Sequence, residues 1–334
     1  MTFTVDIHHH LLPDFYRRAT EHHGQSVGGV RPAVWTRANA LSFMDDAGID
    51  VAVASISAPG VHLGDDQAAA ALARRCNDYL AQMVSSRPDR FGGFAILPLP
   101  DIDAALAELT RALDELFLDG IALLTNAAGH YLDEPLYRPL FDELQRRAAV
   151  VFIHPTTSPG AAAHGLGLPD SLLDFPADTS RGVAQMHYSG TFARTPDVKY
   201  VLSHAGGTLP YLANRFAIID EMGVVPDEEG SRGSAADTFA RLYFDTALSW
   251  SNPTLHTLRA VAGLDRVLYG SDYPYLPTDI AARGRAQLTA SPELSNHERT
   301  AIFNETATTL LPRLAAYAPV DMGRPVGTDN GHST

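Results

Sequence analysis

The sequence predicts an α/β protein, a (β/α)8 or TIM barrel that is distorted and carries loop insertions over its carboxyl-terminal face. Two observations favour this class. Eight short apolar runs, rich in β-branched and aromatic residues, alternate with stretches of helical spacing over the 334 residues. The runs are continuously apolar, as parallel strands buried on both faces should be. A chain of this length lies within the usual range of such a barrel.

The expected elements alternate along the chain. Strands are expected at residues 3–8, 51–56, 91–97, 120–124, 150–154, 199–203, 241–245 and 266–270. Helices are expected at residues 37–47, 66–87, 102–117, 136–147, 180–194, 209–221, 253–262 and 296–310. The first helix ends at Ala47, before Gly48, and glycine is a common helix stop. Asp178 or Thr179 is the expected N-cap of the fifth helix.

The competing architecture is a doubly wound open sheet. That fold usually has a glycine-rich phosphate-binding turn after its first strand. Here the first strand runs instead into His-His-His-Leu-Leu-Pro, residues 8–13. The barrel is therefore the favoured fold.

One domain is expected over residues 1–315, followed by a flexible tail at 316–334 that has little apolar content. Three stretches leave the alternating pattern, at residues 20–36, 156–177 and 222–236. The second and third follow or lie near strand ends that carry candidate site residues. We therefore expect them as loops over the mouth of the site.

The composition limits the partners. With 39 acidic and 25 basic residues the formal net charge is −14, and no basic cluster is present, which argues against nucleic acid or an anionic membrane surface. No apolar run approaches the ~20 residues that span a bilayer, and no signal peptide is visible. The single cysteine, Cys76, excludes an internal disulfide and is expected as a buried apolar residue. We therefore expect a soluble, cytoplasmic protein.

Four of the apolar runs end on residues that can bind a metal or move a proton. His8 and His10 lie two apart on the first strand and so point to the same side, where two neutral imidazoles can hold one divalent cation. A pair of core histidines or the remnant of an expression tag is the alternative. His154 ends the fifth strand, and Asp272 ends the eighth, which adjoins the first when the barrel closes. Asp272 would act as a ligand or as the proton acceptor from metal-bound water.

Three further strand-end groups have expected roles. His204 ends the sixth strand, and because four other groups suffice for one metal, its imidazole is free to act as acid/base near neutral pH. Asp245 ends the seventh strand and is expected to orient a ligand histidine or His204. Tyr273 and Phe175 are expected mainly as core residues, with an aromatic pocket wall as the alternative.

Five segments together resemble the amidohydrolase superfamily, and specifically its decarboxylase branch, over about residues 3–315. The segments are Asp-Ile-His-His-His-Leu-Leu-Pro (6–13), His-Pro-Thr (154–156), Phe-Pro-Ala-Asp-Thr-Ser-Arg (175–181), Ser-His-Ala-Gly-Gly-Thr-Leu-Pro (203–210) and Tyr-Gly-Ser-Asp-Tyr-Pro (269–274). The branch includes the aminocarboxymuconate semialdehyde, γ-resorcylate, 5-carboxyvanillate and 6-methylsalicylate decarboxylases. Two-metal members of the superfamily usually present a lysine on the fourth strand, and residues 120–126 contain none, so a single metal is expected.

The resemblance implies roles for individual residues. The implied metal ligands are His8, His10, His154 and Asp272, with His204 as the catalytic acid/base beside the metal. Arg215 stands at the spacing beyond His204 at which one branch member presents an arginine to the neighbouring subunit's site, where it binds a substrate carboxylate. A homodimer or a dimer of dimers is therefore implied, and a salt bridge on a helix face is the alternative role for Arg215. The His-x-His pattern resembles the zinc-using members, with manganese as the second choice.

Two enzymatic activities fit these residues. The first is metal-dependent, non-oxidative decarboxylation of an aromatic (hydroxybenzoate-type) or enoic carboxylic acid, a small-molecule substrate. The second is hydrolysis of an ester, lactone or amide by a metal-activated water, with Asp272 as the base. A non-catalytic metal-binding or scaffold protein is the third hypothesis, and it treats the strand-end groups as coincidence. The surrounding motifs favour the decarboxylase.

Overall fold

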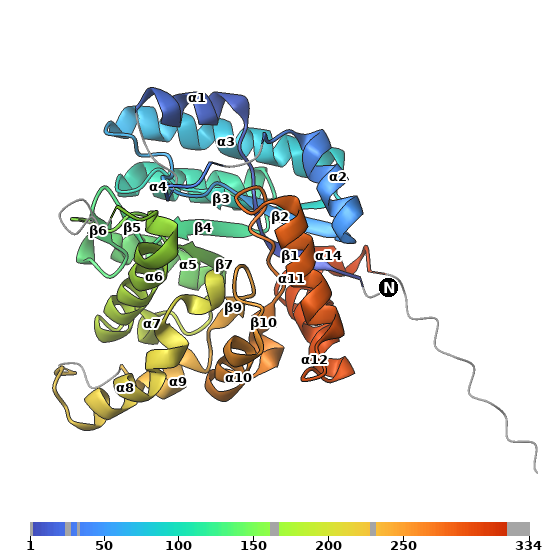
Figure 1. Cartoon of the computed structure of the whole chain (residues 1–334). Coiled ribbons are helices and arrows are strands. Elements are labelled where there is room, and N and C mark those ends of the chain that lie inside the picture. Colours follow the sequence, from blue (N-terminus) through green and yellow to red (C-terminus); the bar gives the residue numbers. More distant parts are fainter. Residues whose placement is uncertain (1–2, 24–27, 32–33, 161–166, 228–231, 319–334) are drawn as a thin grey trace, which may run out of the picture.

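Eight parallel strands form the centre of the computed structural model, which describes residues 3–23, 28–31, 34–160, 167–227 and 232–318 (Figure 1). Their order in the sheet is β1-β2-β3-β4-β7-β8-β9-β10. The strands are β1 (Val5–His10), β2 (Val51–Ser55), β3 (Phe91–Ile96), β4 (Gly120–Leu124), β7 (Val150–His154), β8 (Lys199–Leu202), β9 (Tyr243–Asp245) and β10 (Val267–Leu268). The predicted strands are thus confirmed, with β1 extending two residues further than expected.

Backbone hydrogen bonds between β1 and the chain that follows β10 close the barrel. The amide of Ile7 donates to the carbonyl of Tyr269 at 2.9 Å, and the amide of His10 donates to that of Tyr273 at 2.7 Å. The amide of Asp272 donates in the other direction, to the carbonyl of His8, at 2.9 Å. The expected (β/α)8 barrel is confirmed, and its last seam is made by a few irregular contacts instead of a long ladder.

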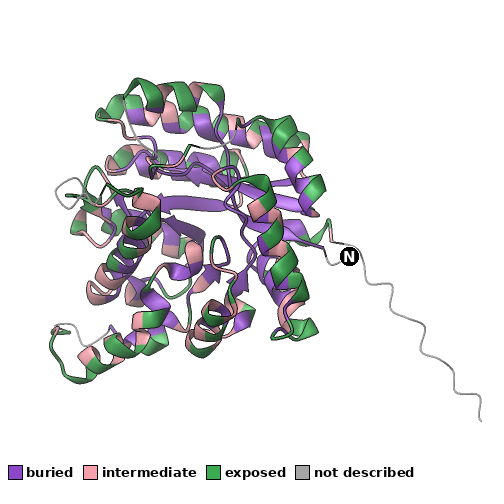
Figure 2. Ribbon diagram, viewed as in Figure 1, coloured by how far each residue is buried: buried purple, intermediate pink, exposed green. Residues whose placement is uncertain are grey.

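Side chains alternate between two cores, as the pleat of a strand requires. One core fills the barrel, where Ile7, Val53, Phe94 and Phe152 are fully buried. The larger core lies between the strands and the surrounding helices. Figure 2 shows the consequence: the central strands are buried throughout, and the helices are exposed on their outer faces only.

Helices follow the strands around the barrel. They are α1 (Asp14–His22), α2 (Arg37–Ala47), α3 (Asp66–Ser86), α4 (Ile102–Thr110), α5 (Arg138–Arg146), α6 (Asp170–Tyr188), α7 (Thr191–Arg194), α8 (Leu209–Glu221), α9 (Ala235–Phe239), α10 (Asn252–Val261), α11 (Thr278–Ala290), α12 (Asn296–Thr300), α13 (Thr306–Leu310) and α14 (Pro312–Ala315). A two-stranded hairpin of β5 (Asn126–Ala127) and β6 (His130–Tyr131) follows β4. Among the described residues, no helix combines the length and apolar character needed to cross a membrane.

The prediction of a helix start at Asp178 or Thr179 is wrong. Helix α6 begins at Asp170, runs through Pro176, and buries both predicted cap residues in its middle. A proline in a helix removes one backbone hydrogen bond. Here the helix nevertheless continues, and the Asp178 carboxylate accepts hydrogen bonds from the Tyr131 hydroxyl at 2.5 Å and from the Asn126 amide at 3.3 Å. Contacts with the β5–β6 hairpin therefore hold Asp178 inside the helix, although the local sequence predicts that a helix starts there.

Helix α11 was missed because its buried side is made of small residues. Only Ala281, Gly284 and Leu288 are buried along it, so it lacks the apolar stripe on which a periodicity argument depends. A methyl group added at Gly284 would come within 2.6 Å of the Trp250 ring. Close packing on Trp250 thus holds this helix.

The division into a domain at 1–315 and a tail at 316–334 stays a prediction. Most of that tail lies outside the described residues, as do parts of the three expected loops.

Gly207 gives a prediction on stability. A methyl group at this position would lie 2.2 Å from the carbonyl oxygen of Pro176 on α6, and the residue has φ of +65°. We expect Gly207→Ala to lower the free energy of unfolding by at least about 3 kcal/mol, because backbone strain and overlap add. Gly223 has φ of +62° and no atom near its added methyl, so Gly223→Ala is the matched control, with an expected loss of about 1–2 kcal/mol. Urea denaturation of both variants measures the difference, and equal losses would contradict the close approach.

Candidate metal centre

Strand β1 places His8 and His10 inside the barrel. Their Nε2 atoms lie 2.9 Å apart, and both rings are fully buried. His9 points the other way, where its ring stacks on Tyr273 at a centroid distance of 4.8 Å. The alternation expected from the sequence therefore holds at this strand end.

Each of three buried histidines turns its Nδ1 toward an acceptor. His8 Nδ1 lies 2.6 Å from the Asp245 carboxylate, His154 Nδ1 lies 2.7 Å from the Pro155 carbonyl, and His10 Nδ1 lies 3.4 Å from the Ser55 carbonyl. Because an acceptor faces each Nδ1, that nitrogen carries the proton of the neutral ring, and Nε2 is the nitrogen whose lone pair a cation can take. Hydrogen-bond acceptors at the ring nitrogen that does not bind the metal fix the ring orientation of metal-binding histidines. The three Nε2 lone pairs are thus prepared for a cation.

Asp272 adds a carboxylate to this cluster. Its Oδ1 lies 3.3 Å from His8 Nε2 and 3.1 Å from His10 Nε2. The residue has φ of +57°, and its amide is held by the His8 carbonyl across the closing seam of the barrel. Three imidazoles and one carboxylate are a donor set that suits zinc and related divalent ions.

His204 lies on the open side of the cluster. Its Nε2 is 3.6 Å from Asp272 Oδ2, and its ring centroid is 4.8 Å from that of His8. The backbone is left-handed at His204 and Ala205, and the His204 amide donates to Asp245 Oδ1 at 2.8 Å. Strand β8 thus ends in a tight turn that presents this imidazole to the cluster.

Two sets of four ligands are geometrically available. The ligand atoms of His8, His154, His204 and Asp272 all lie within 4.8 Å of one another. The set implied by the sequence has His10 in place of His204, and His10 Nε2 lies 2.9 Å from His8 Nε2 and 3.1 Å from Asp272 Oδ1. We favour the set with His10, because His10 is fully buried and has an acceptor at Nδ1, whereas the buried His204 Nδ1 has no hydrogen-bond partner among the described residues. The assignment stays a prediction.

A pocket of about 470 Å³ opens onto the cluster. Its polar wall is formed by His154, His204 and Asp272, and most other lining residues are apolar. Phe175 is one of them, so it is a pocket wall as well as a core residue, whereas Tyr273 does not line the pocket. Among the residues that the structure describes, the lining contains neither lysine nor arginine.

Burial and neighbouring charges shift the pKa values of the cluster in opposite directions. Burial lowers the pKa of His10 to about 4 and holds that of His154 well below its usual range. Burial alone would also lower the pKa of His8, but the carboxylates of Asp245 and Asp272 raise it to about 10. Burial would raise the pKa of Asp272, but the charge of His8 holds it well below its usual range. In the metal-free cluster these shifts favour one additional proton on His8, beyond the Nδ1 proton of each neutral ring.

The proton on His8 predicts how metal binding depends on pH. A metal can bind His8 only after this proton leaves, so each binding event should release about one proton at neutral pH. The apparent affinity should rise about tenfold per pH unit and level off near pH 10, where His8 loses the proton by itself. Titration calorimetry in buffers of different ionisation enthalpy measures the released protons. Binding without proton release between pH 6.5 and 8.5 would contradict the assignment.

Asp245 links two parts of the site. It accepts from His8 Nδ1 and from the His204 amide, which places it where the sequence suggested an orienting residue. We expect Asp245→Asn to keep the fold and to weaken metal binding about 10–100-fold. This is the usual effect of removing a group that hydrogen-bonds to a metal-binding histidine. Competition with a chromophoric chelator measures this affinity. Asp142→Asn, at an exposed position on α5, is the control, and equal affinities for both variants would refute the role.

The predicted substrate-binding residue lies outside the pocket, and two residues that were not predicted contribute to the site or to the closing seam. Arg215 lies on the exposed face of α8, away from the pocket of its own chain, and within the described residues it forms no ion pair. Tyr275 lines the pocket beside His10, at a ring distance of 5.2 Å, and was missed because its segment is irregular. Asp6 was also missed as a structural group. Its carboxylate accepts from the amide and hydroxyl of Ser271, at 2.9 and 2.5 Å, and so joins β1 to the chain after β10.

A parallel eight-stranded barrel with a buried histidine and aspartate cluster at the carboxyl ends of its strands defines a metal-dependent barrel enzyme. The chain belongs to the amidohydrolase family, whose model matches residues 5–313. It is 36% identical to the decarboxylase yanB of Aspergillus niger, over 96% of this chain and 90% of that protein. It is also 36% identical to the 6-methylsalicylic acid decarboxylase acuB of Aspergillus aculeatus, over 93% of this chain and 96% of that protein.

Solved structures share the fold. A crystal structure of an amidohydrolase II superimposes with a TM-score of 0.86 at 30% identity, over 92% of this chain and 99% of that chain. A dihydroxybenzoic acid decarboxylase from Polaromonas, solved with manganese and the inhibitor 2-nitroresorcinol, has a TM-score of 0.79 at 24% identity, over 93% of this chain and 97% of that chain. The predicted membership of the decarboxylase branch is confirmed by the curated relatives.

Proposed function

We propose that this chain is a metal-dependent, non-oxidative decarboxylase of a hydroxybenzoate-type acid. The observation that carries the proposal is the convergence of His8, His10, His154 and the Asp272 carboxylate beside a mostly apolar pocket, with His204 at its side. Relatives that cover more than nine tenths of the chain are named as decarboxylases, one of them for 6-methylsalicylic acid.

The chain's own residues supply the proton and exclude water. A bound divalent ion would hold the carboxylate or a neighbouring phenolate and stabilise negative charge. His204 then donates its proton to the ring carbon that bears the carboxylate, which interrupts the conjugation of the ring. The bond to the carboxylate breaks, carbon dioxide leaves, and the electron pair restores the aromatic ring. Apolar walls such as Phe175 and Leu276 keep the site dry and strengthen these electrostatic interactions.

The metal we propose is a single zinc ion, held by His8, His10, His154 and Asp272. The His-x-His pattern on β1 and the absence of a lysine on β4 support this choice, since Leu124 stands at the end of that strand. Manganese, bound in the Polaromonas structure, is the alternative. Metal analysis of the purified protein, followed by chelation and reconstitution with each ion, separates the two. A cytoplasmic location likewise remains part of this proposal.

We also propose a homodimer in which Arg215 serves the partner's pocket. No lysine or arginine of the described part of the chain lines the pocket, while Arg215 is exposed on α8 beside Tyr211 and Ile218, residues that are 84% and 47% exposed. Mixing two inactive variants tests the arrangement. A dimer of one Arg215→Ala chain and one His204→Ala chain contains one complete site, so activity should return on mixing. Activity that does not return would place Arg215 outside the site.

The decisive assay for the function is the release of carbon dioxide from a panel of hydroxybenzoates. We expect turnover of at least one 2-hydroxybenzoate, and loss of that turnover on exhaustive chelation. Esters and lactones form the second arm, because a hydrolase would use the same metal with Asp272 as its base. Hydrolysis of these compounds without any loss of carbon dioxide from the acids would refute the proposal.

A further inference from the structure

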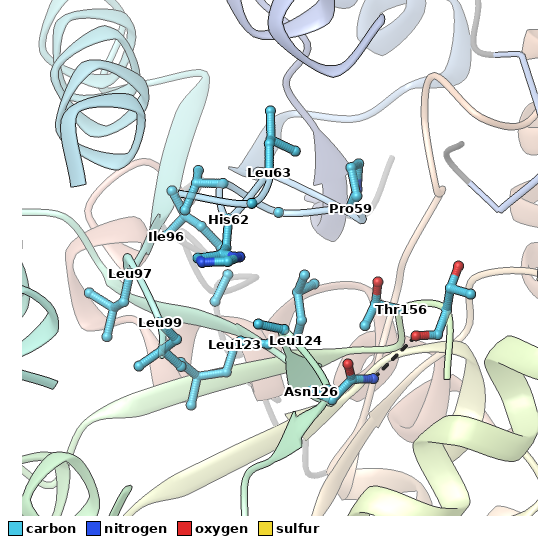
Figure 3. A pocket seen from close by; sticks show the side chains of 18 of the residues that line it. Pro59, His62, Leu63, Ile96, Leu97, Leu99, Leu123, Leu124, Asn126 and Thr156 are labelled. Carbon is cyan, nitrogen blue, oxygen red and sulfur yellow. Dashed lines mark hydrogen bonds between the residues drawn. The ribbon is translucent and has the colours of Figure 1, made fainter. Parts of the chain in front are cut away.

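A second cavity of about 420 Å³ lies on the same face of the barrel as the metal pocket, and Figure 3 shows the side chains that line it. The loop after β2, residues 59–64, forms one wall, with His62 and Leu63 above the cavity. The ends of β3 and β4 and the β5–β6 hairpin form the others. The cavity reaches down to Ala122, a residue of the barrel interior, and is therefore a deep feature of the carboxyl-terminal face.

The chemistry of this cavity suits an uncharged, apolar group. Within the described part of the chain, its lining contains many aliphatic side chains and none from lysine, arginine, aspartate or glutamate. Its larger polar side chains already have partners. His62 Nε2 lies 3.0 Å from Asp66, the Asn126 amide donates to Asp178 at 3.3 Å, and the Thr157 hydroxyl donates to Asp170 at 2.8 Å. The lining also exposes polar groups over nearly as much surface as apolar ones, so a ligand here gains from apolar burial along the aliphatic part of the wall.

Only a thin partition separates the cavity from the metal pocket. Leu124 lines the cavity and pairs in register with His154, so both side chains point to the same side of the sheet. The turn from Ser57 to Gly60 completes the partition, since Ser57 lines the metal pocket and Gly60 the cavity. Gly60 lies so close to Leu124 that an added methyl group would be 2.8 Å from Cδ1. One leucine side chain against one turn thus divides the two spaces.

The metal pocket alone has room for a one-ring acid, since ligand pockets of about 300–1,000 Å³ hold drug-sized molecules. The second cavity adds capacity on the other side of this partition. We propose that the Leu124 side chain turns away from Gly60 when substrate binds and that the cavity is then the subsite for an apolar substituent, so that the preferred substrate is a hydroxybenzoate whose ring carries an alkyl chain longer than methyl. This inference rests on the proposed decarboxylase function.

Chain length is the variable that tests the subsite. The probes are 6-methyl-, 6-propyl- and 6-pentylsalicylate, assayed for carbon dioxide release. We expect kcat/KM to rise about fourfold (about 0.8 kcal/mol) per added methylene until the cavity is full. A kcat/KM that stays flat or falls from methyl to pentyl would overturn the subsite while leaving the decarboxylase in place.

Variants that fill the cavity from two different walls provide a second test of the subsite. Ala127→Phe, on β5, and Leu63→Trp, in the loop after β2, should both abolish the gain with chain length and leave the methyl compound unaffected. Ala262→Phe is the matched control, because Ala262 is also half-buried against the core but lies outside both cavities. The inference falls if folded filling variants keep the wild-type preference for long chains.

Binding of the uncharged products separates the subsite from the activity. Calorimetry with 3-methylphenol and 3-pentylphenol on the metal-loaded protein should show tighter binding of the pentyl compound, and Ala127→Phe should remove the difference. If this holds while no salicylate loses carbon dioxide, the cavity is an apolar binding site and the decarboxylase proposal fails. Equal binding of both phenols overturns the subsite, whatever the activity.

Discussion

His204→Ala is expected to keep its metal and to lose its turnover. The His204 imidazole lies 3.6 Å from Asp272 on the open side of the cluster, while three other histidines and Asp272 remain to hold the ion. Removal of a general acid usually costs about 10²–10⁴-fold in rate. We therefore expect kcat for carbon dioxide release to fall by this factor with about one metal still bound per chain.

The control for this experiment is His297→Ala, which removes an exposed histidine on α12. It should retain both metal and activity. Elemental analysis after gel filtration and a carbon dioxide assay give the two readouts independently. A His204→Ala protein that lacks metal would contradict the acid/base role and would place His204 among the ligands, in the set that excludes His10.

His154→Ala is expected to lose both metal and turnover. His154 is buried at the end of β7, and its Nδ1 is held by the Pro155 carbonyl, so its Nε2 is oriented before any metal arrives. Loss of an outer partner weakens metal binding about 10–100-fold, and loss of a ligand should cost more. We expect the metal content after dialysis against a chelator to fall to background, together with carbon dioxide release.

Metal titration distinguishes a lost ligand from a lost fold. The circular dichroism spectrum of His154→Ala should match that of the wild type, because the substitution leaves the barrel strands intact. Excess metal should restore part of the activity if the remaining ligands still bind weakly. A variant with full metal content and no activity would instead assign His154 to catalysis, in contradiction to its predicted role.

Much of the barrel could be predicted because parallel strands are continuous apolar runs. Helices with a clear apolar stripe or a glycine stop, such as α2 and α8, were predicted at their observed ends. The N-terminal half of α6 was missed because Pro176 looks like a break, and α11 was missed because its buried face is small. In both cases the deciding contacts come from segments far away in the sequence.

Part of the site, like part of the fold, could be predicted from the sequence. His8, His10, His154, His204 and Asp272 were named from the sequence because strand ends of a barrel meet at one face. Their distances, the orientation of Nδ1 in three of them, and the shared role of Asp245 required the folded chain. Tyr275 and the turn at Ser57 escaped prediction because irregular segments have no period from which a direction could be derived.

By itself, the sequence determined which residues can carry the chemistry and the order in which they meet the barrel. Periodicity and residue type are local properties, and they suffice to place a histidine or an aspartate at the end of a strand. Tertiary structure decided which atoms face one another, that Arg215 lies away from its own pocket, and that a second apolar cavity adjoins the first. These features depend on contacts between distant segments, for which a single sequence carries no separate signal.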